Sequence, residues 1–205
     1  MRDMGAFEDA VTAWAVGGSG GPARELASLL RVRAAVLLEG RSDVAAVDAL
    51  AARRGRDLAA EGICVLSIGG AMSVGRYARL LGPPGLGLRL TGLCDEGERD
   101  YYARGFANAG AERDDFFVCV ADLEEELVRA LGVARVEELV REEGDGRPLQ
   151  TFLRQPAQQG RAPQQQLRRF LGTKKGRKIH YGRVLVEALT PDQVPQPLDG
   201  LFTVL

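Results

Sequence analysis

The stretch Arg33-Ala-Ala-Val-Leu-Leu-Glu-Gly-Arg-Ser-Asp43 decides the fold of this chain. Its apolar first half, residues 33–38, is typical of a short buried strand. The acid, glycine and Ser-Asp pair that follow mark a turn and the start of a helix, which we expect to run from about Asp43 to Arg54. One strand, one turn and one helix therefore form a unit, and the rest of the chain can be searched for the same order.

The unit recurs three times. Further apolar runs occupy residues 62–68, 88–94 and 116–120, and each precedes a helical pattern, at about residues 73–81, 98–109 and 123–131. Four short strands that alternate with helices predict an α/β fold with a mainly parallel four-stranded sheet flanked by helices. Ligands of such sheets bind beyond the carboxyl ends of the strands, so that edge is where functional residues are expected.

The segments on either side of this core read as helical. Residues 1–31 place Phe7, Val11 and Trp14 at helical spacing, and we interpret the Gly17–Gly21 run as a flexible hinge because it lacks the Gly-Lys-Ser/Thr ending of a phosphate loop. The expected organisation is a helical segment over 1–31, a core over 32–132 and a helical C-terminal extension over 133–205. The extension should hold helices at 136–143, 149–154, 164–171 and 181–189, and an extended tail with Pro191, Pro195 and Pro197.

Composition narrows the class of protein. The 205 residues carry 27 Lys+Arg against 28 Asp+Glu, so any nucleic-acid contact must come from local clustering of charge. Cys64, Cys94 and Cys119 each lie in an apolar run, which indicates reduced, buried thiols, and a chain with His180 as its one histidine does not favour zinc. Neither a membrane-spanning stretch nor a signal peptide is recognisable, so we expect a cytoplasmic protein.

Acidic residues follow three of the four expected strands. Glu39 and Asp43 follow the first, Asp95 the third, and Asp122 and Glu124 the fourth. If the strands are parallel, these acids meet at one sheet edge, where a hard divalent cation would relieve their mutual repulsion. Each acid taken alone is more often a helix cap that accepts hydrogen bonds from free N–H groups. Their recurrence at three strand ends favours the metal site.

Glu39-Gly40-x-x-Asp43, the Asp after a later strand and Asp122-Leu-Glu124 resemble the TOPRIM fold. Together with the basic segment Gly176-Arg177-Lys178, they are most similar to the nuclease half of the OLD (overcoming lysogenization defect) family. The resemblance implies that Glu39 and Asp43 hold one Mg²⁺ or Mn²⁺, that Asp95 bridges, and that Asp122 and Glu124 hold a second ion. Gly97 stands where TOPRIM domains usually carry a second Asp; Glu96, Glu98 or water would have to substitute, which puts the second metal in doubt.

Two hard cations about 4 Å apart can clamp the attacking and leaving oxygens of a phosphoryl displacement. The resemblance implies that Glu39 and Asp95 are catalytic and that Lys178 stabilises negative charge in the transition state. Residues 174–181 are the most basic window of the chain, and with Arg168 and Arg169 they form either a platform for phosphates, with Arg177 and Lys175 behind Lys178, or a solvated loop. His180 is expected to be a bystander. Trp14, Tyr101 and Tyr102 either stack on bases or, more commonly, pack within helices.

These observations favour a divalent-metal-dependent endonuclease acting on DNA, with an ATPase supplied in trans if nucleotide is needed at all. One alternative keeps the fold but acts on RNA or transfers nucleotides; another is a catalytically weak TOPRIM scaffold that binds DNA. The hydrolytic interpretation depends on the acids converging. Acids on opposite sides of the molecule, or lysine and arginine partners filling the gap between them, would contradict it.

Overall fold

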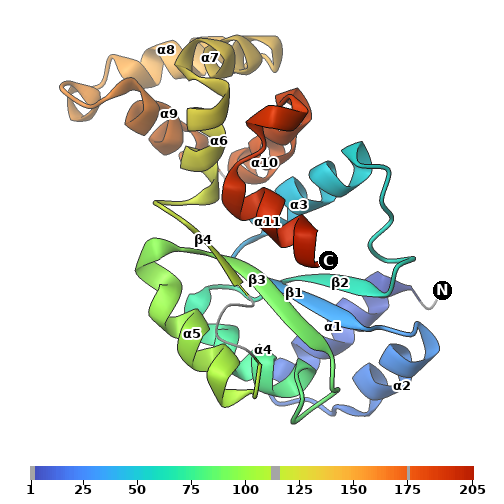
Figure 1. The fold of residues 1–205 in the computed structure, drawn as a ribbon. Helices are drawn as coiled ribbons and strands as arrows, with labels where there is room; N and C mark the ends of the chain where they lie inside the picture. Colours follow the sequence, from blue (N-terminus) through green and yellow to red (C-terminus); the bar gives the residue numbers. More distant parts are fainter. Residues whose placement is uncertain (1–2, 112–115, 175) are drawn as a thin grey trace.

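A computed structural model describes residues 3–111, 116–174 and 176–205. Its sheet has four strands in the order β2-β1-β3-β4, and every neighbouring pair is parallel (Figure 1). The strands are β1 (Ala34–Leu38), β2 (Ile63–Ser67), β3 (Arg89–Asp95) and β4 (Phe116–Cys119). The predicted α/β class and parallel sheet are confirmed, and each strand lies within a residue of its predicted bounds.

The register brings the carboxyl ends of the strands together. Leu38 at the end of β1 pairs with Ser67 of β2 and Leu93 of β3, and Asp95 at the end of β3 pairs with Cys119 of β4. Side chains alternate between the two faces of the sheet. Ala35, Leu37 and Leu66 therefore belong to one hydrophobic core, whereas Val36, Leu38 and Val65 belong to the other.

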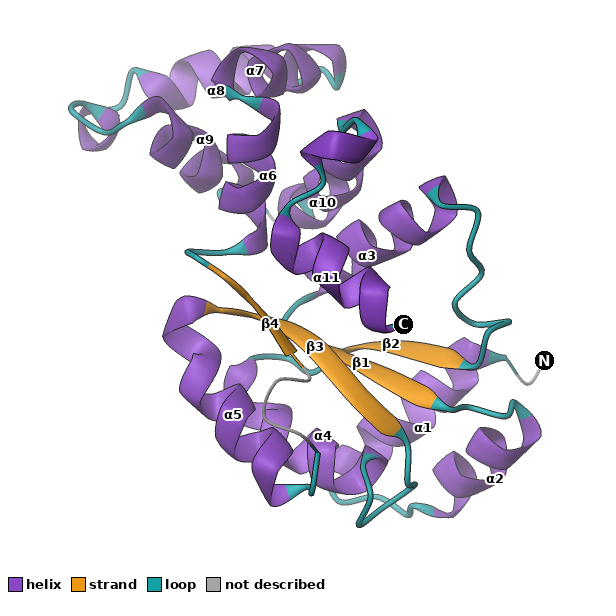
Figure 2. Ribbon diagram, in the orientation of Figure 1, coloured by secondary structure: helices purple, strands orange, loops and turns teal. Residues whose placement is uncertain are grey.

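One face is covered by α1 (Met4–Ala15), α4 (Val74–Leu81) and α5 (Arg99–Asn108), with α2 (Gly21–Leu29) beside α1 (Figure 2). Tyr102 is fully buried here, and Trp14 packs under the Arg24 guanidinium at 4.8 Å, so both serve helix packing. The expected hinge at Gly17–Gly21 is a packed turn instead. A Cβ on Gly20 would lie 2.5 Å from the Trp14 ring, so glycine is needed there for close approach.

The other face is covered by α3 (Arg41–Arg53) and α11 (Gln196–Val204), and α10 (Arg177–Ala188) packs on α3. Helices α3 and α10 touch closely, because a Cβ on Gly182 would lie only 2.6 Å from the Ser42 carbonyl oxygen. The Arg53 guanidinium also donates to the carbonyls of Val186 and Leu189 near the end of α10, at 2.5 and 2.6 Å. Helix α10 thus lies along α3, with contacts from the first turn of α3 at Ser42 to its last residue, Arg53.

The remaining helices stand away from the sheet. α6 (Leu123–Leu131) leads from β4 to a cluster of α7 (Val133–Glu142), α8 (Gly146–Leu153) and α9 (Pro163–Leu171), and α10 returns to pack on α3 (Figure 1). The predicted helices of the extension are confirmed, although α10 begins four residues earlier than expected, at Arg177.

The extended tail was a wrong prediction. Pro191 opens a 3-10 turn over Pro191–Gln193, and Pro197 lies in the first turn of α11, where no intrahelical N–H bond is lost. Leu198, Leu201 and Phe202 of α11 are buried against the sheet. The prolines therefore start helices here, and they do not prevent them.

The three cysteines are free and buried, as expected. Within the described ranges, no helix has the length and apolar character needed to cross a membrane.

Candidate metal centre

The acids predicted from the sequence gather at the carboxyl edge of the sheet. Asp95 is the last residue of β3, and burial raises its pKa to about 7, with further contributions from the charges of Asp122, Glu39 and Asp43. Repulsion of this kind requires short separations. The acids that follow β1, β3 and β4 therefore lie close enough to destabilise one another's charge.

Glu39 and Asp43 are placed by the turn from β1 into α3. Asp43 caps the helix: the Gly40 N–H donates to Asp43 Oδ2 at 2.9 Å. Burial, and then the charge of Glu124, nevertheless raise the pKa of Asp43 to about 7. Burial and the charge of Glu98 likewise raise the pKa of Glu39. Burial and neighbouring negative charge therefore disfavour the ionised form of both carboxylates, although Asp43 accepts the capping hydrogen bond.

The turn after β2 supports Glu39 from the side. Gly69 and Gly70 have φ of 71° and 112°, values that favour glycine, and the Gly70 N–H donates to the Glu39 carbonyl at 3.2 Å. The glycines thus form the tight turn considered from the sequence, and it holds the backbone of the first acid.

Asp122 is fully engaged. It is the N-cap of α6, where its Oδ1 accepts from the Glu125 N–H at 2.8 Å and its Oδ2 accepts from Arg168 Nε at 2.6 Å. The capping role weighed from the sequence is real for Asp122 as it is for Asp43. Arg168, expected on a phosphate platform, instead contacts an acid 46 residues away.

Glu124 and Lys178 meet in the centre. The Glu124 side chain is only 3% exposed, and Lys178 Nζ lies 3.0 Å from Glu124 Oε2. The contact is an ion pair without hydrogen-bond geometry, so this buried oxygen has no hydrogen-bond partner. Burial lowers the pKa of Lys178, but the charges of Glu124, Asp43 and Asp122 outweigh that effect and raise it. Lys178 is therefore held as a cation among the acids.

The sequence left open whether Glu96 or Glu98 substitutes for the second Asp that Gly97 replaces, and the two side chains differ in their surroundings. Of the two glutamates that flank Gly97, Glu96 faces Arg99 at the surface, at 3.7 Å, whereas the charge of Glu98 acts on Glu39. Both belong to the 3-10 turn Glu96–Glu98, which aims one side chain outward and the other toward the acids. Glu98 is the side chain placed to compensate for Gly97.

The basic window is helical from Arg177 onward, whereas Lys174 and Gly176 precede the helix in turn structure. Gly176, at φ 82°, precedes α10, and residues 177–180 form the first turn of that helix. Arg177 is buried and bidentate to Asp145, with both N–O distances 3.0 Å, so it is not available to a phosphate as expected. His180 contacts Glu143 at 2.8 Å, which suits a bystander. Lys175 lies outside the described residues.

Cationic side chains line a cavity next to the acids. A cavity of about 410 Å³ beside Asp122 is lined by Arg168, Arg169 and Lys178, together with Phe152, Gly172 and Thr173. The side chains of Arg168 and Lys178 are 40% and 46% exposed, so both can reach solvent from this cavity. The geometry therefore places positive charge next to the acids, where an anionic substrate would arrive.

The donor set fits a hard cation. Six carboxylates, those of Glu39, Asp43, Asp95, Glu98, Asp122 and Glu124, supply only oxygen, the ligand that Mg²⁺ and Mn²⁺ prefer. Glu124 Oε2 is a buried carboxylate oxygen whose charge is balanced by Lys178 but which accepts no hydrogen bond. As they stand, no three acid, histidine or cysteine side chains among the described residues are arranged to hold an ion, since caps and cations engage Asp43, Asp122 and Glu124. Metal binding would require these side chains to exchange partners.

Comparison with known proteins agrees with this architecture. Residues 32–96 match the family model described as overcoming lysogenization defect protein-like, TOPRIM domain. The C-terminal region of the Xanthomonas campestris pv. campestris OLD protein is similar over 84% of this chain and 93% of that one, at a TM-score of 0.63 and 23% identity. The C-terminal region of the Burkholderia pseudomallei OLD protein is similar over 84% of this chain and 96% of that one, at a TM-score of 0.62 and 18% identity. No match was found among curated proteins. The chain thus has a TOPRIM domain that resembles the OLD type. The structural similarity also reaches beyond residues 32–96, because it covers 84% of this chain.

Proposed function

We propose that this chain is a divalent-metal-dependent nuclease that hydrolyses phosphodiester bonds of DNA. The observation that carries the proposal is the convergence of acids from three strand ends, with the pKa values of Asp43 and Asp95 each raised to about 7. Carboxylates that repel one another in this way favour a bound cation, and TOPRIM domains generally bind divalent metals.

Lysine and arginine partners do lie among the acids, which is the arrangement that could have contradicted hydrolysis. They do not neutralise the site. Lys178 and Arg168 face six carboxylates, and the pKa of Asp95 stays raised although the charge of Lys178 lowers it. Both cations are partly exposed on flexible stems, so they are free to turn toward a phosphate once an ion takes their place.

The residues would divide the work as follows. Glu39 and Asp43 would hold one Mg²⁺ or Mn²⁺, Asp122 and Glu124 would hold a second, and Asp95 would be shared between the two. When bound, such ions polarise the phosphate and lower the pKa of a coordinated water. Lys178 faces the same space and would stabilise charge that develops on the phosphate. Arg168 and Arg169 would bind the nucleic-acid backbone on either side.

A cleavage assay tests this function. Purified protein with Mg²⁺ or Mn²⁺ would be offered supercoiled DNA, linear DNA and structured RNA, beside the variants Glu39→Ala and Asp122→Ala. Asp57→Ala, which removes a carboxylate in the loop between α3 and β2, outside the acid cluster, is the matched control. We expect metal-dependent nicking of DNA that both site variants lose and the control retains.

The same assay separates the alternatives. Cleavage of RNA alone would indicate an RNA-processing enzyme, and DNA binding without cleavage would indicate the catalytically weak scaffold that Gly97 makes conceivable. Repeating the reaction with ATP and a cell extract tests the expected ATPase in trans, which would raise the rate only when both are present.

A further inference from the structure

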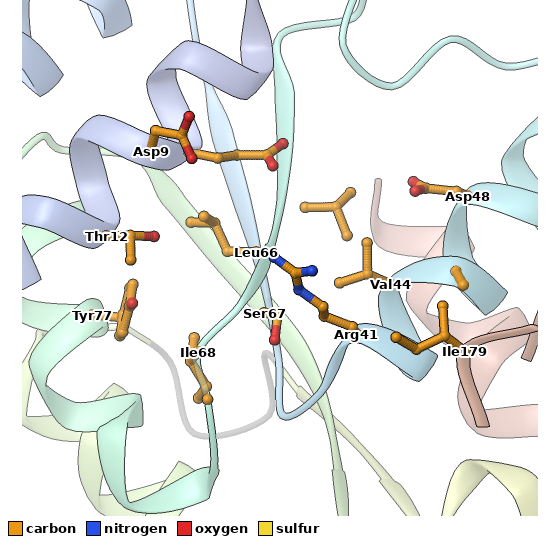
Figure 3. A pocket seen from close by; sticks show the side chains of 14 residues that line it. Asp9, Thr12, Arg41, Val44, Asp48, Leu66, Ser67, Ile68, Tyr77 and Ile179 are labelled. Carbon is orange, nitrogen blue, oxygen red and sulfur yellow. The ribbon is translucent and has the colours of Figure 1, made fainter. Parts of the chain in front are cut away.

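A second cavity lies at the outer edge of the sheet. It measures about 570 Å³ and lies between α1 and α3, with β2 as its floor (Figure 3). Glu8, Asp9 and Thr12 line it from α1, and Arg41, Val44, Ala45 and Asp48 line it from α3. The floor is the run 65–69 of β2 and the turn that follows it. The cavity is therefore a groove that exposes one side of a strand.

That side of β2 has no neighbouring strand. β2 is outermost in the sheet order and pairs only with β1 among the described residues. In a parallel strand, successive residues direct their backbone N–H and C=O groups to opposite sides of the strand. The Ile68 N–H points toward β1, because it donates to the Leu38 carbonyl at 2.9 Å. By alternation, Val65 and Ser67 offer their backbone groups to the groove. A bare edge of this kind is a template for another strand.

The walls of the groove are acidic on both faces of the strand. Asp9 projects from α1 and Asp48 from α3, on opposite sides of β2 (Figure 3). Glu8 is half-buried, and burial followed by the charges of Asp48 and Asp9 raises its pKa to about 7, so these carboxylates repel across the groove. In the described part of the chain none of the three forms an ion pair, and Arg41 is the only cation that lines the cavity.

We propose that this groove binds an extended, basic peptide segment of a partner protein, which adds to the free edge of β2 as a fifth strand. Backbone hydrogen bonds to Val65 and Ser67 would supply affinity. Side chains of an added strand alternate between the faces, so two adjacent basic residues would reach Asp48 on one wall and Glu8 with Asp9 on the other. Leu66, Tyr77 and Ile179 offer apolar surface to their aliphatic stems.

Charge also decides against nucleic acid as the occupant. Three carboxylates against one guanidinium would repel a phosphate backbone. A basic protein segment is attracted by the same walls and can satisfy the strand edge, which a nucleic acid cannot. The groove is thus a protein-binding surface, and it borders the acid cluster, because Arg41 and Ile179 line it and lie close to Asp43 and Lys178 in the chain.

Fluorescence anisotropy with a labelled peptide, Ser-Val-Lys-Lys-Val-Ser, tests the proposal at about 150 mM salt with EDTA present. We expect saturable binding. The double variant Glu8→Gln/Asp48→Asn should weaken it by roughly tenfold or more, since it removes a charge from each wall. The matched control Glu138→Gln/Asp199→Asn removes the same charge on α7 and α11 and should leave affinity unchanged. Thermal melting of each variant confirms that it is folded.

Two altered peptides distinguish strand addition from simple charge attraction. A peptide with Glu in place of Lys should not bind. A peptide N-methylated at alternate residues keeps its charge but loses its backbone donors, and it should bind at least roughly tenfold more weakly. Equal binding of the methylated and parent peptides, or no saturable binding of the parent, would overturn the proposal. Because EDTA removes divalent metal, the outcome is independent of whether the chain is a nuclease.

Discussion

At the scale of single residues, Asp122 shows how the candidate centre is held in the absence of metal. One of its oxygens caps α6 and the other accepts from Arg168 at 2.6 Å. An ion that uses Asp122 must therefore displace the guanidinium. Arg168 would act as a competitor for the second metal and would be released beside the substrate when that metal binds.

Removing this competitor should tighten metal binding. Arg168→Ala is expected to raise the affinity for Mn²⁺ by roughly threefold to tenfold, about 1 kcal/mol, which is the scale of a partly exposed ion pair. Isothermal titration calorimetry measures it directly, with Arg169→Ala as the control that removes a neighbouring cation without a contact to Asp122. Weaker binding in Arg168→Ala would show that the arginine orients Asp122 for the ion and does not compete with it.

Arg177 makes a different contribution, to stability. It is bidentate to Asp145, donates to Thr173 Oγ1 at 2.6 Å and lies 4.2 Å from the Phe170 ring centroid. Arg177→Met should lower the free energy of unfolding by about 2 kcal/mol, because it removes the guanidinium from the partly buried Asp145, which keeps the Tyr181 hydroxyl as a donor at 3.3 Å. Urea denaturation measures the loss. Adding Asp145→Asn should restore part of it; a further loss in the double variant would contradict the pairing argument.

These residues also mark how far the sequence could predict the site. Glu39, Asp95 and Asp122 were found because each directly follows an apolar strand, and local order along the chain determines that position. The partners of Arg168 and Arg177 were not found, because they lie 46 and 32 residues away and depend on how α9 and α10 pack. A basic window looks the same whether its arginine is buried or exposed.

At the scale of elements, the crossing of α10 over α3 sets the position of Lys178. Gly182 permits it, since a Cβ there would lie 2.6 Å from the Ser42 carbonyl oxygen. Lys178 lies one turn earlier on α10, and Asp43 follows Ser42 on α3. The distance between these two helices therefore determines how deeply the lysine enters among the acids.

Gly182→Ala should destabilise the protein, although alanine in place of a helical glycine usually stabilises. Alanine in a helix interior normally stabilises by about 1 kcal/mol over glycine, but here the methyl group would force α10 away from a backbone atom. We expect a lower midpoint in urea and a lower cleavage rate at saturating DNA. Gly75→Ala in α4, whose Cβ would lie 3.7 Å from Gly105 Cα, is the control. A stabilised Gly182→Ala protein would show that the two helices can separate at no cost.

The strands were predictable element by element, and α11 was not. Four apolar runs bounded by turns have few other interpretations in an α/β chain. The tail carries three prolines, which usually indicate extended chain, and only the packing of Leu198 and Leu201 on the sheet shows that a helix forms there. That contact joins distant parts of the sequence, and no local pattern contains it.

At the scale of the whole molecule, the acids at the strand ends make stability depend on pH and on metal. The pKa values of Asp43 and Asp95 are about 7 in the folded protein, against about 4 for a free aspartate. A raised acid pKa means that the folded state binds the proton more tightly. Its stabilising contribution is complete below about pH 4 and is lost as the pH rises through about 7.

Millimolar Mg²⁺ should therefore raise the melting temperature by several degrees at about pH 8 and by much less at about pH 5. Differential scanning fluorimetry with and without metal gives both shifts. The variant Glu39→Gln/Asp95→Asn should melt higher than the parent without metal at the alkaline pH and should lose most of the metal effect. An equal shift in parent and variant would place the ion elsewhere.

The position of α10 and α11 late in the sequence, where they pack on α3 and on the sheet, has a consequence for biosynthesis. The acids belong to residues 39–124, but the lysine among them and these two helices belong to residues 177–204. A nascent chain on the ribosome would thus carry its negative cluster for many seconds of translation before Lys178 and these helices emerge. If the chain is the nuclease proposed above, the arrangement that hydrolysis needs would be complete only late in synthesis.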